Sequence, residues 1–433
     1  MSDRSLPATP SVAEDAALEV DRAAPAAPPS VWGRTFAALQ YPNYRLWFMG
    51  QLVSLVGTWM QTTAQGFPVF ELTRSPAYLG YVGFAAGAPS LLLMLFGGVV
   101  ADRVPRRNLL VITQTTMLVL AFILAGLTFT KLVQPWHIIV LALALGTANA
   151  FDAPAGQAFV LELVDRKSLT NAIALNGSLG NLATVVGPTV AGLTYAAFGA
   201  AWCFTLNGLS FIAVIVALLL MRLPQRPPTA RAQSPLAQLK EGLRYLLGHP
   251  LLRTLLMVPA VAVLFVAIYG TLLPAWAVEV LHGDATTNGL LQSSRGAGSL
   301  MGALMIASLA HLGRRGRWLT LGSFVYPALI LVLALTRTLP LSMAALVGVG
   351  LGGMMVYNMA NALVQSQVSD EFRGRVMSVY SLIMFGGMPL GSLWAGTAAN
   401  SLGAPATLIL GASVALVCAA LFWFRVPQIR GMR

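Results

Sequence analysis

The chain consists largely of long apolar runs, separated by short segments rich in charged and turn-forming residues. Most runs reach or exceed about 20 residues, the length that a helix rising about 1.5 Å per residue needs to cross the hydrocarbon core of a bilayer. The pattern therefore predicts an all-α membrane protein with twelve transmembrane helices. The expected spans are approximately 45–70, 77–101, 108–130, 136–160, 170–197, 200–221, 251–279, 286–310, 318–336, 340–364, 376–399 and 404–425.

Basic residues gather in alternate loops, which predicts the side that each loop faces. With the N-terminus placed in the cytoplasm, only Arg74, Lys131 and Arg337 fall in outer loops and Arg295 falls within a span, whereas every other Lys and Arg lies on the inner side. Membrane proteins retain positive residues in their cytoplasmic loops. We therefore expect a multi-pass protein with both termini in the cytoplasm.

The longest connection, 223–250, divides the spans into two groups of six. Its second part has leucines at helical spacing, as expected of an amphipathic helix lying on a membrane surface. We predict an N-terminal six-helix bundle over 36–222, this cytoplasmic linker, and a C-terminal six-helix bundle over 251–426. Residues 1–35 are expected to form a disordered cytoplasmic tail and residues 427–433 a short cytoplasmic one.

The composition excludes several classes of function. Hydrophobic residues make up 57% of the chain and charged residues only 10%, against about 25% charged in soluble domains. The net charge of +12 does not indicate a nucleic-acid partner, because the basic residues alternate between loops. Cys203 and Cys418 lie in apolar stretches and the four histidines lack ligand spacing, so no metal is expected. No catalytic constellation and no phosphate-binding glycine loop is visible, so we expect neither an enzyme nor a cofactor.

A charged hinge joins the second and third spans. It reads Gly98-Val-Val-Ala-Asp102-Arg103-Val-Pro105-Arg106-Arg107 and resembles motif A of the major facilitator superfamily, with proline where the usual pattern has glycine. The resemblance covers nearly everything from Phe36 to Val426. It implies two pseudo-symmetric six-helix bundles around a central site, a small-molecule substrate, and a monomer driven by an ion gradient. We expect the ions to be protons, exchanged against the substrate.

A second motif lies in the middle of the fifth span. Gly187-Pro188-Thr-Val-Ala-Gly192 resembles motif C, which in the superfamily marks antiporters, that is exporters; ordinary small-residue packing is the alternative interpretation. The eleventh span carries a related segment, Gly386-Gly387-Met-Pro389-Leu-Gly391, as two repeated halves would require.

Three further segments resemble the branch of bacterial exporters that includes the enterobactin exporter and macrolide-efflux-like proteins. They begin at Gly50, Asn149 and Arg373. The resemblance implies export of a small organic molecule, a siderophore or a drug-like compound, across a bacterial inner membrane. Uptake, or lipid-type flipping, is the alternative that the same fold permits.

Two ionisable residues within the spans are candidates for coupling and binding. Asp152 lies in the cytoplasmic half of the fourth span, where it either carries a proton, released by a neighbouring basic group, or forms a structural hydrogen bond near Pro154. Arg295 lies nearer the midplane of the eighth span. It either binds an anionic substrate or a carboxylate partner, or extends its side chain outward to the membrane surface.

Polar and aromatic residues on other spans predict the lining of a substrate cavity. We expect this role for Trp59, Gln61 and Gln65 on the first span, with interhelical hydrogen bonds as the alternative. The same two interpretations apply to the remaining candidates, which are Asn149, Tyr357, Asn358 and Asn361.

The charged hinge itself is predicted to act as a gate rather than to bind substrate. It lies at the cytoplasmic ends of its two spans, beyond the reach of a molecule at the midplane. In the state open to the outside, Asp102 is expected to interact with the N-terminal end of the eleventh span, near Arg373 and Arg375.

Overall fold

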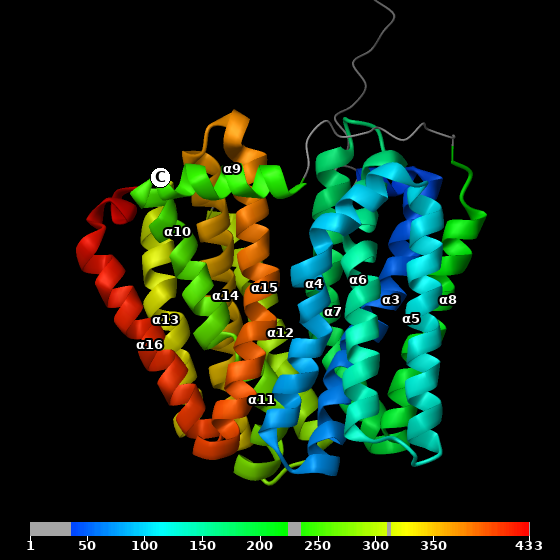
Figure 1. Ribbon diagram of the computed structural model, residues 1–433. Helices are drawn as coiled ribbons and strands as arrows, with labels where there is room; N and C mark the ends of the chain where they lie inside the picture. Colours follow the sequence, from blue (N-terminus) through cyan, green and yellow to red (C-terminus); the bar gives the residue numbers. More distant parts are fainter. Residues whose placement is uncertain (1–35, 224–234, 310–312, 433) are drawn as a thin grey trace, which may run out of the picture.

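The computed structural model describes residues 36–223, 235–309 and 313–432, so the predicted tail over 1–35 lies outside the described residues. The described chain is all-helical, as predicted, and the helices gather into two bundles (Figure 1). The N-terminal bundle comprises η1 (Ala37–Gln40), α3 (Pro42–Thr73), α4 (Pro76–Arg103), α5 (Arg106–Phe129), α6 (Pro135–Leu163), α7 (Leu169–Phe198) and α8 (Ala200–Leu220).

The seventh span, at the start of the C-terminal bundle, is composite. It consists of α10 (Pro250–Val261), a π-helical turn η2 (Ala262–Val266), α11 (Tyr269–Ala275) and a second π-helical turn η3 (Trp276–Val280). The other helices of the bundle are α12 (Ala285–Leu309), α13 (Arg315–Leu335), α14 (Leu339–Gln367), α15 (Asp370–Leu402) and α16 (Ala404–Arg425).

Helix ends follow from local sequence, and two of them repeat between the halves. Proline occupies the first turn of α3, α4, α6, α10, α14 and α16, where its missing N–H costs no hydrogen bond. Gly199 joins α7 to α8 at φ +86°, and Gly403 joins α15 to α16 at φ +83°. Glycine alone adopts such angles readily, so the two halves share the same glycine turn at corresponding positions.

Hydropathy separates the helices into two kinds. Within the described residues, nine are long and apolar enough to cross a membrane. The predicted spans that fall outside this group correspond to α3, α7 and α12, which carry many Gln, Asn, Ser and Thr residues. All three pack at the boundary between the bundles, where polar groups can face protein or a cavity instead of lipid.

Two helix pairs join the bundles, and both depend on close approach of backbones. In the α4–α15 seam, a Cβ at Gly80 would lie 2.7 Å from the Ser392 carbonyl oxygen, and one at Gly87 would lie 2.9 Å from the Pro389 ring. The Ser75 hydroxyl donates a hydrogen bond to the Asn400 amide oxygen at 2.7 Å at the end of the seam. In Figure 1 the ribbons of α4 and α15 approach each other toward the end of the molecule that lies opposite α9.

The α7–α12 seam contains the second sequence motif. A Cβ at Gly289 would lie 2.8 Å from the Gly192 Cα, and the Thr189 and Ser293 hydroxyls lie 2.7 Å apart. Toward the other end of α7, a Cβ at Gly177 or Gly180 would meet no atom within 4 Å. The bundles are thus joined tightly on one side of the molecule, which we call the far side, and lie further apart on the other.

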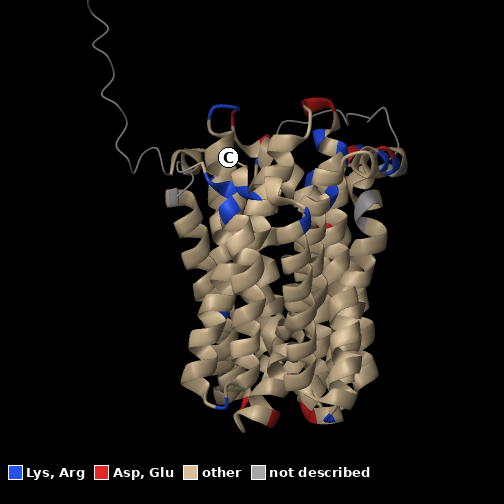
Figure 2. Ribbon diagram, turned by 90° about the vertical axis from the view of Figure 1, so that its left-hand side faces the viewer, with Lys and Arg blue, Asp and Glu red and all other residues tan. Residues whose placement is uncertain are grey.

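The opposite side, which we call the linker side, carries α9 (Pro235–Leu247) and the C-terminal η5 (Pro427–Gly431). Most Lys and Arg residues lie at this side (Figure 2). The predicted amphipathic helix α9 lies across the end of the C-terminal bundle, where Glu241 pairs with Arg375 at 3.0 Å and Tyr245 stacks on Phe372 at 4.4 Å. A Cβ at Gly242 would clash with the Arg375 carbonyl group, so this contact is intimate.

The seam on the far side predicts a specific cross-link. Cysteines replacing Ser75 and Asn400, in a chain whose own Cys203 and Cys418 are changed to Ala, should form a disulfide under mild oxidation, because the native side chains are hydrogen-bonded across the seam. The measurement is a mobility shift on a non-reducing gel after proteolytic cleavage within the linker. The matched pair Gly177→Cys with Asn400→Cys, which joins opposite sides, should not cross-link; equal yields for both pairs would contradict the assignment.

Candidate functional site

A partly buried cation lies at the boundary between the bundles. The Arg295 guanidinium of α12 stacks over the Trp59 ring of α3, with 5.5 Å from its carbon to the ring centroid. Tyr269 of α11, Tyr326 of α13 and Tyr357 of α14 also interact electrostatically with this guanidinium. Aromatic faces and phenol groups stabilise a positive charge without neutralising it. The Arg295 side chain therefore points into protein, and does not extend to the membrane surface.

The charge of Arg295 has no acidic counterpart in the described part of the chain. None of the ion pairs there involves this side chain, and its Nε atom is buried without a hydrogen-bond partner. The Tyr357 hydroxyl is likewise buried, and its neighbour among the described residues is the Tyr326 hydroxyl. A cation in the membrane interior is costly unless it is paired or faces water, so this arrangement suits an anionic group that arrives with a ligand.

The residues around Arg295 come together because several helices are interrupted or closely packed. Gly187 of α7 faces α3, where a Cβ would lie 2.5 Å from the Trp59 Cβ. Gly350 of α14 lies against the Arg295 backbone, where a Cβ would meet the carbonyl oxygen. The π-helical turns on either side of α11 change the direction of the side chains there, and π-helical turns occur frequently at functional sites.

Sequence reasoning missed Tyr269 and Tyr326. Both are aromatic residues in strongly apolar spans, where membrane-facing or core positions are equally compatible with the pattern. One signal was present for the first: Pro259, Gly270 and Pro274 interrupt the seventh span, and discontinuous helices accompany central sites in transporters.

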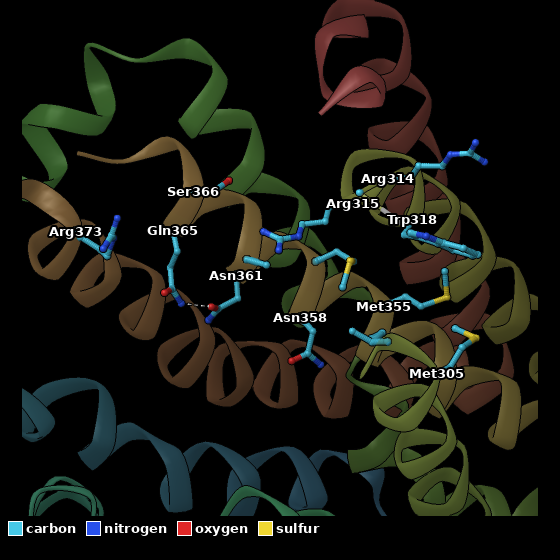
Figure 3. Close-up of a pocket in the computed structure, with 14 residues that line it drawn as sticks. Met305, Arg314, Arg315, Trp318, Met355, Asn358, Asn361, Gln365, Ser366 and Arg373 are labelled. Atoms are coloured by element: carbon cyan, nitrogen blue, oxygen red, sulfur yellow. Dashed lines mark hydrogen bonds between the residues drawn. The ribbon is translucent and has the colours of Figure 1, made fainter. Parts of the chain in front are cut away.

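A cavity of about 570 Å³ opens in the C-terminal bundle toward the linker side (Figure 3). Arg315 points from the start of α13 toward the amide side chains of α14, whereas Arg314 points away from them. The indole Nε1 of Trp318 is buried without a hydrogen-bond partner among the described residues. The lining consists of Met305, Ile306, Gly313, Arg314, Arg315, Trp318, Met355, Asn358, Met359, Asn361, Ala362, Gln365, Ser366 and Arg373.

Two of the predicted lining amides, Asn358 and Asn361, belong to this cavity. Asn358 donates to the Met354 carbonyl oxygen of its own helix at 3.1 Å, and Asn361 accepts from the Gln365 amide at 2.5 Å. Both bonds lie within α14, and the Asn361 amide also interacts with the Tyr380 hydroxyl of α15. Cationic, amide, thioether and aromatic groups therefore line one space.

The structure places the predicted amides of the N-terminal bundle differently. Gln61 is buried and accepts a 2.7 Å hydrogen bond from Asn207 of α8, inside the bundle, so its interhelical alternative describes it. Gln65 is buried on the same helix, with 7% of its surface exposed. Asn149 is partly buried on α6. Of the lining residues predicted on the N-terminal bundle, Trp59 is the one that contacts Arg295 among the described residues.

Asp152 lies between α5 and α6. Its carboxylate accepts hydrogen bonds from the Thr113 hydroxyl at 2.5 Å and the Gln114 amide at 3.2 Å. The sequence suggested a basic group next to Asp152. Among the described residues, no basic side chain forms an ion pair with it. Pro154, two residues further along α6, lines a cavity of about 270 Å³ between the bundles. Asp152 points instead toward α5 and is held by neutral donors inside the N-terminal bundle.

The charged hinge forms a compact network on the linker side. Arg106 lies 3.5 Å from Asp102 and 2.5 Å from Glu162 of α6, and Arg107 donates to the Leu219 carbonyl oxygen at 2.9 Å. Arg103 is exposed, and Gly98 has no neighbour within 4 Å of an added Cβ. Sequence reasoning missed Glu162, although an acid at the end of a span near three arginines was a usable signal.

The contact expected between Asp102 and the start of α15 is absent from the described residues in this state. Arg373 pairs with Asp370 at 2.5 Å, and Arg375 pairs with Glu241 of the linker helix. The expectation concerned the state open to the outside, whereas here the far side is closed. The turn itself is made by extended backbone at Val104 and Pro105, so proline replaces glycine without strain.

The family profile of transmembrane secretion effectors matches residues 33–432, which is nearly the whole chain. The chain belongs to this family of major facilitator transporters. It is accordingly a multi-pass membrane transporter and not an enzyme. The resemblance seen in the motifs is confirmed at the level of the family.

Among characterised relatives, the chain is similar to two siderophore transporters. It is 25% identical to the staphyloferrin A transporter of Staphylococcus aureus over 391 residues, covering 89% of this chain and 96% of that protein. It is 28% identical to the enterobactin exporter EntS of Escherichia coli K12 over 420 residues, covering 90% and 95%.

Solved structures confirm the fold. The nucleoside transporter NupG superposes with a TM-score of 0.72 at 15% identity, covering 88% of this chain and 98% of that one. An inward-facing bacterial homologue of the lysosomal transporter Spinster superposes with a TM-score of 0.71 at 15% identity, covering 90% and 97%. At such identities the likeness concerns the fold alone.

Because Gln61 bonds inside its bundle, its replacement should affect stability. We expect Gln61→Ala to lower the free energy of unfolding by about 1 kcal/mol, since the Asn207 amide loses its interhelical partner. Thermal unfolding in detergent measures the loss. Thr62→Ala is the matched control, because that exposed hydroxyl bonds only within its own helix. Equal melting temperatures for both variants would contradict the structural role.

Proposed function

We propose that this protein exports a small organic molecule, a siderophore or a drug-like compound, by alternating access in exchange for protons. Its substrate is expected to carry an anionic group. The family supports transport across a membrane, and the two siderophore transporters among its relatives support the substrate class. Export is the direction that the second motif favours, and a monomer suffices because each chain contains both halves.

The membrane orientation in this proposal follows the distribution of charge. The linker side carries most Lys and Arg residues (Figure 2), and positive residues are retained in the cytoplasm. The linker side therefore faces the cytoplasm of a bacterial cell, and both termini lie there. The far side faces outward from the inner membrane.

One observation carries the proposal: the bundles are sealed on the far side and separated on the linker side, and Arg295, which pairs with no acid among the described residues, lies between them. Gly192 and Gly289 close one seam and Gly80 and Gly396 the other. A molecule from the cytoplasm can thus approach the Arg295 region while the outward path is blocked. This is the arrangement that an exporter needs in order to load its substrate.

Residues of the C-terminal half, together with Trp59 of α3, are assigned to substrate binding. Arg295 would hold the anionic group, and Trp59 and Tyr357 would contact its aromatic or apolar part. Asn358 and Asn361 would bind polar groups nearer the cytoplasm. Gln61 is left out of this set, since its amide is engaged inside the N-terminal bundle.

Asp152 is assigned to proton coupling. A carboxylate held by a hydroxyl and an amide has no fixed cation to balance it, so protonation changes the net charge of the site. The hinge around Asp102, Arg103, Arg106 and Arg107 is assigned to gating, with Gly98 allowing close approach when the linker side closes. The motif at Gly187, Pro188 and Gly192 is assigned to the far-side seal.

Transport by inverted membrane vesicles tests the proposed function. With an interior acidified by proton pumping, vesicles containing the protein should accumulate siderophores or fluorescent organic dyes, and an uncoupler should abolish the uptake. Arg295→Gln should lower the affinity for an anionic substrate about 10-fold or more, because a charge-assisted hydrogen bond is lost.

Vesicles with empty membranes are the background, and Arg425→Gln, at an exposed helix end, is the matched charge control. Gradient-independent uptake would refute antiport. Movement only in right-side-out vesicles would favour an importer, and transfer of labelled phospholipid without any soluble substrate would favour a flippase.

The coupling role of Asp152 gives a separate prediction. Asp152→Asn should keep substrate binding within about twofold but make transport independent of the proton gradient, since the amide cannot titrate. Thr113→Val, which removes a donor and keeps the carboxylate, is the matched control and should remain coupled. Coupled transport by Asp152→Asn would remove this residue from the mechanism.

A further inference from the structure

A groove of about 660 Å³ lies on the outer surface of the C-terminal bundle, between α13, α16 and the terminal turn η5. Its surroundings face away from the boundary with the other bundle: 48% of Leu321 and 77% of Phe424 are exposed. Figure 1 shows α16 as an outermost helix, with the red C-terminal turn beside α13 at the linker end. The groove therefore opens toward lipid at the level where the linker-side leaflet has its head groups.

Two arginines line the upper part of this groove. Arg430 lies 3.8 Å above the Trp423 ring and donates a 2.7 Å hydrogen bond to the Trp423 carbonyl oxygen. Its Nε atom is buried and has no hydrogen-bond partner among the described residues. Arg317, one turn into α13, is exposed. Stacking on the indole fixes the orientation of one guanidinium and leaves donors of both available.

The arginines have no acidic residue nearby in the sequence to neutralise them. From Ala285 to the C-terminus, the chain contains only two acids, Asp370 and Glu371. These lie at the start of α15, where they pair with Arg373 and Arg375. No acid lines the groove. Among the described residues, no acid forms an ion pair with either arginine, so a ligand can supply the counter-charge.

The lower part of the groove is apolar. Leu321 and Phe324 follow Arg317 along α13, and Phe324 meets Trp423 edge to face at 6.0 Å. Seven residues of helix separate Arg317 from Phe324, which corresponds to about 10 Å of depth. A positive upper end above an apolar wall of this depth matches a phosphate and the first part of an acyl chain.

From this arrangement we infer that the groove binds a phospholipid with an anionic head group, taken from the linker-side leaflet. The phosphate lies between Arg317 and Arg430, and an acyl chain lies against Leu321 and Phe324. Because Met432 accepts a hydrogen bond from the Gly316 N–H at 3.1 Å, the terminal turn is fixed to α13 and keeps the two arginines on one groove. The inference does not depend on the transported substrate.

Thermal unfolding of the full-length protein in detergent tests the site. Added phosphatidylglycerol should raise the melting temperature, whereas phosphatidylcholine and inorganic phosphate should not, because binding needs both the charge and the chain. Each arginine near a membrane surface contributes about fivefold in affinity. Arg317→Gln with Arg430→Gln should therefore raise the phosphatidylglycerol concentration for half of the shift by at least about 10-fold.

Arg425→Gln is the matched control, because this exposed arginine ends α16 but does not line the groove. An unchanged phosphatidylglycerol response in the double variant would overturn the site, and an equal response to inorganic phosphate would overturn the lipid as its ligand. If the double variant does not fold, Arg317→Gln alone carries the test through its exposed side chain. Native mass spectrometry should then show at least about threefold less retained phosphatidylglycerol than wild type, and equal retention would overturn the site.

Discussion

The structure depends on two seams in which backbone lies against backbone. At Gly80 and Gly396, and at Gly192 and Gly289, there is no room for a side chain between helices of opposite bundles. In a bilayer, apolar side chains gain little by leaving lipid for protein, so close van der Waals contact carries helix association. Small residues at these places allow that contact, and the position of the seams sets which side of the molecule is closed.

A close contact inside the N-terminal bundle shapes the environment of the partly buried cation. Gly187 brings α7 against α3 beneath Trp59, and Trp59 forms one wall around Arg295. The two halves differ in the charge they place within the membrane. Among the described residues, Arg295 of the C-terminal half pairs with no carboxylate, and Asp152 of the N-terminal half is held by neutral donors. An anionic ligand could supply the missing counter-charge of Arg295, and a proton that of Asp152.

The sequence was informative wherever lipid imposes a strong constraint. The spans could be predicted because a helix in hydrocarbon must be long and apolar, and the linker because its leucines repeat at helical spacing. The more polar helices α3, α7 and α12 were predicted as apolar runs between charged or turn segments, like the other spans, although their hydropathy is lower. Their polarity follows from their position at the boundary between bundles, which hydropathy does not describe.

Within the candidate site, the sequence indicated residue types but not their directions. Gln61 and Trp59 lie two residues apart on α3, so they point to different sides; one bonds to Asn207 and the other meets Arg295. Tyr269 is the first residue of α11, between two π-helical turns that alter the local winding. Such directions depend on helix rotation and local winding, which arise from packing among helices distant in the chain.

Because α9 packs tightly against α15, this part of the linker belongs structurally to the C-terminal half. Glu241 and Tyr245 hold Arg375 and Phe372, and Gly242 admits the α15 backbone between them. This 13-residue helix must therefore move with α15 as one body or release both side chains together. The segment that separates the packed elements of the two halves is therefore not the full linker but the shorter stretch between Leu220 and Pro235.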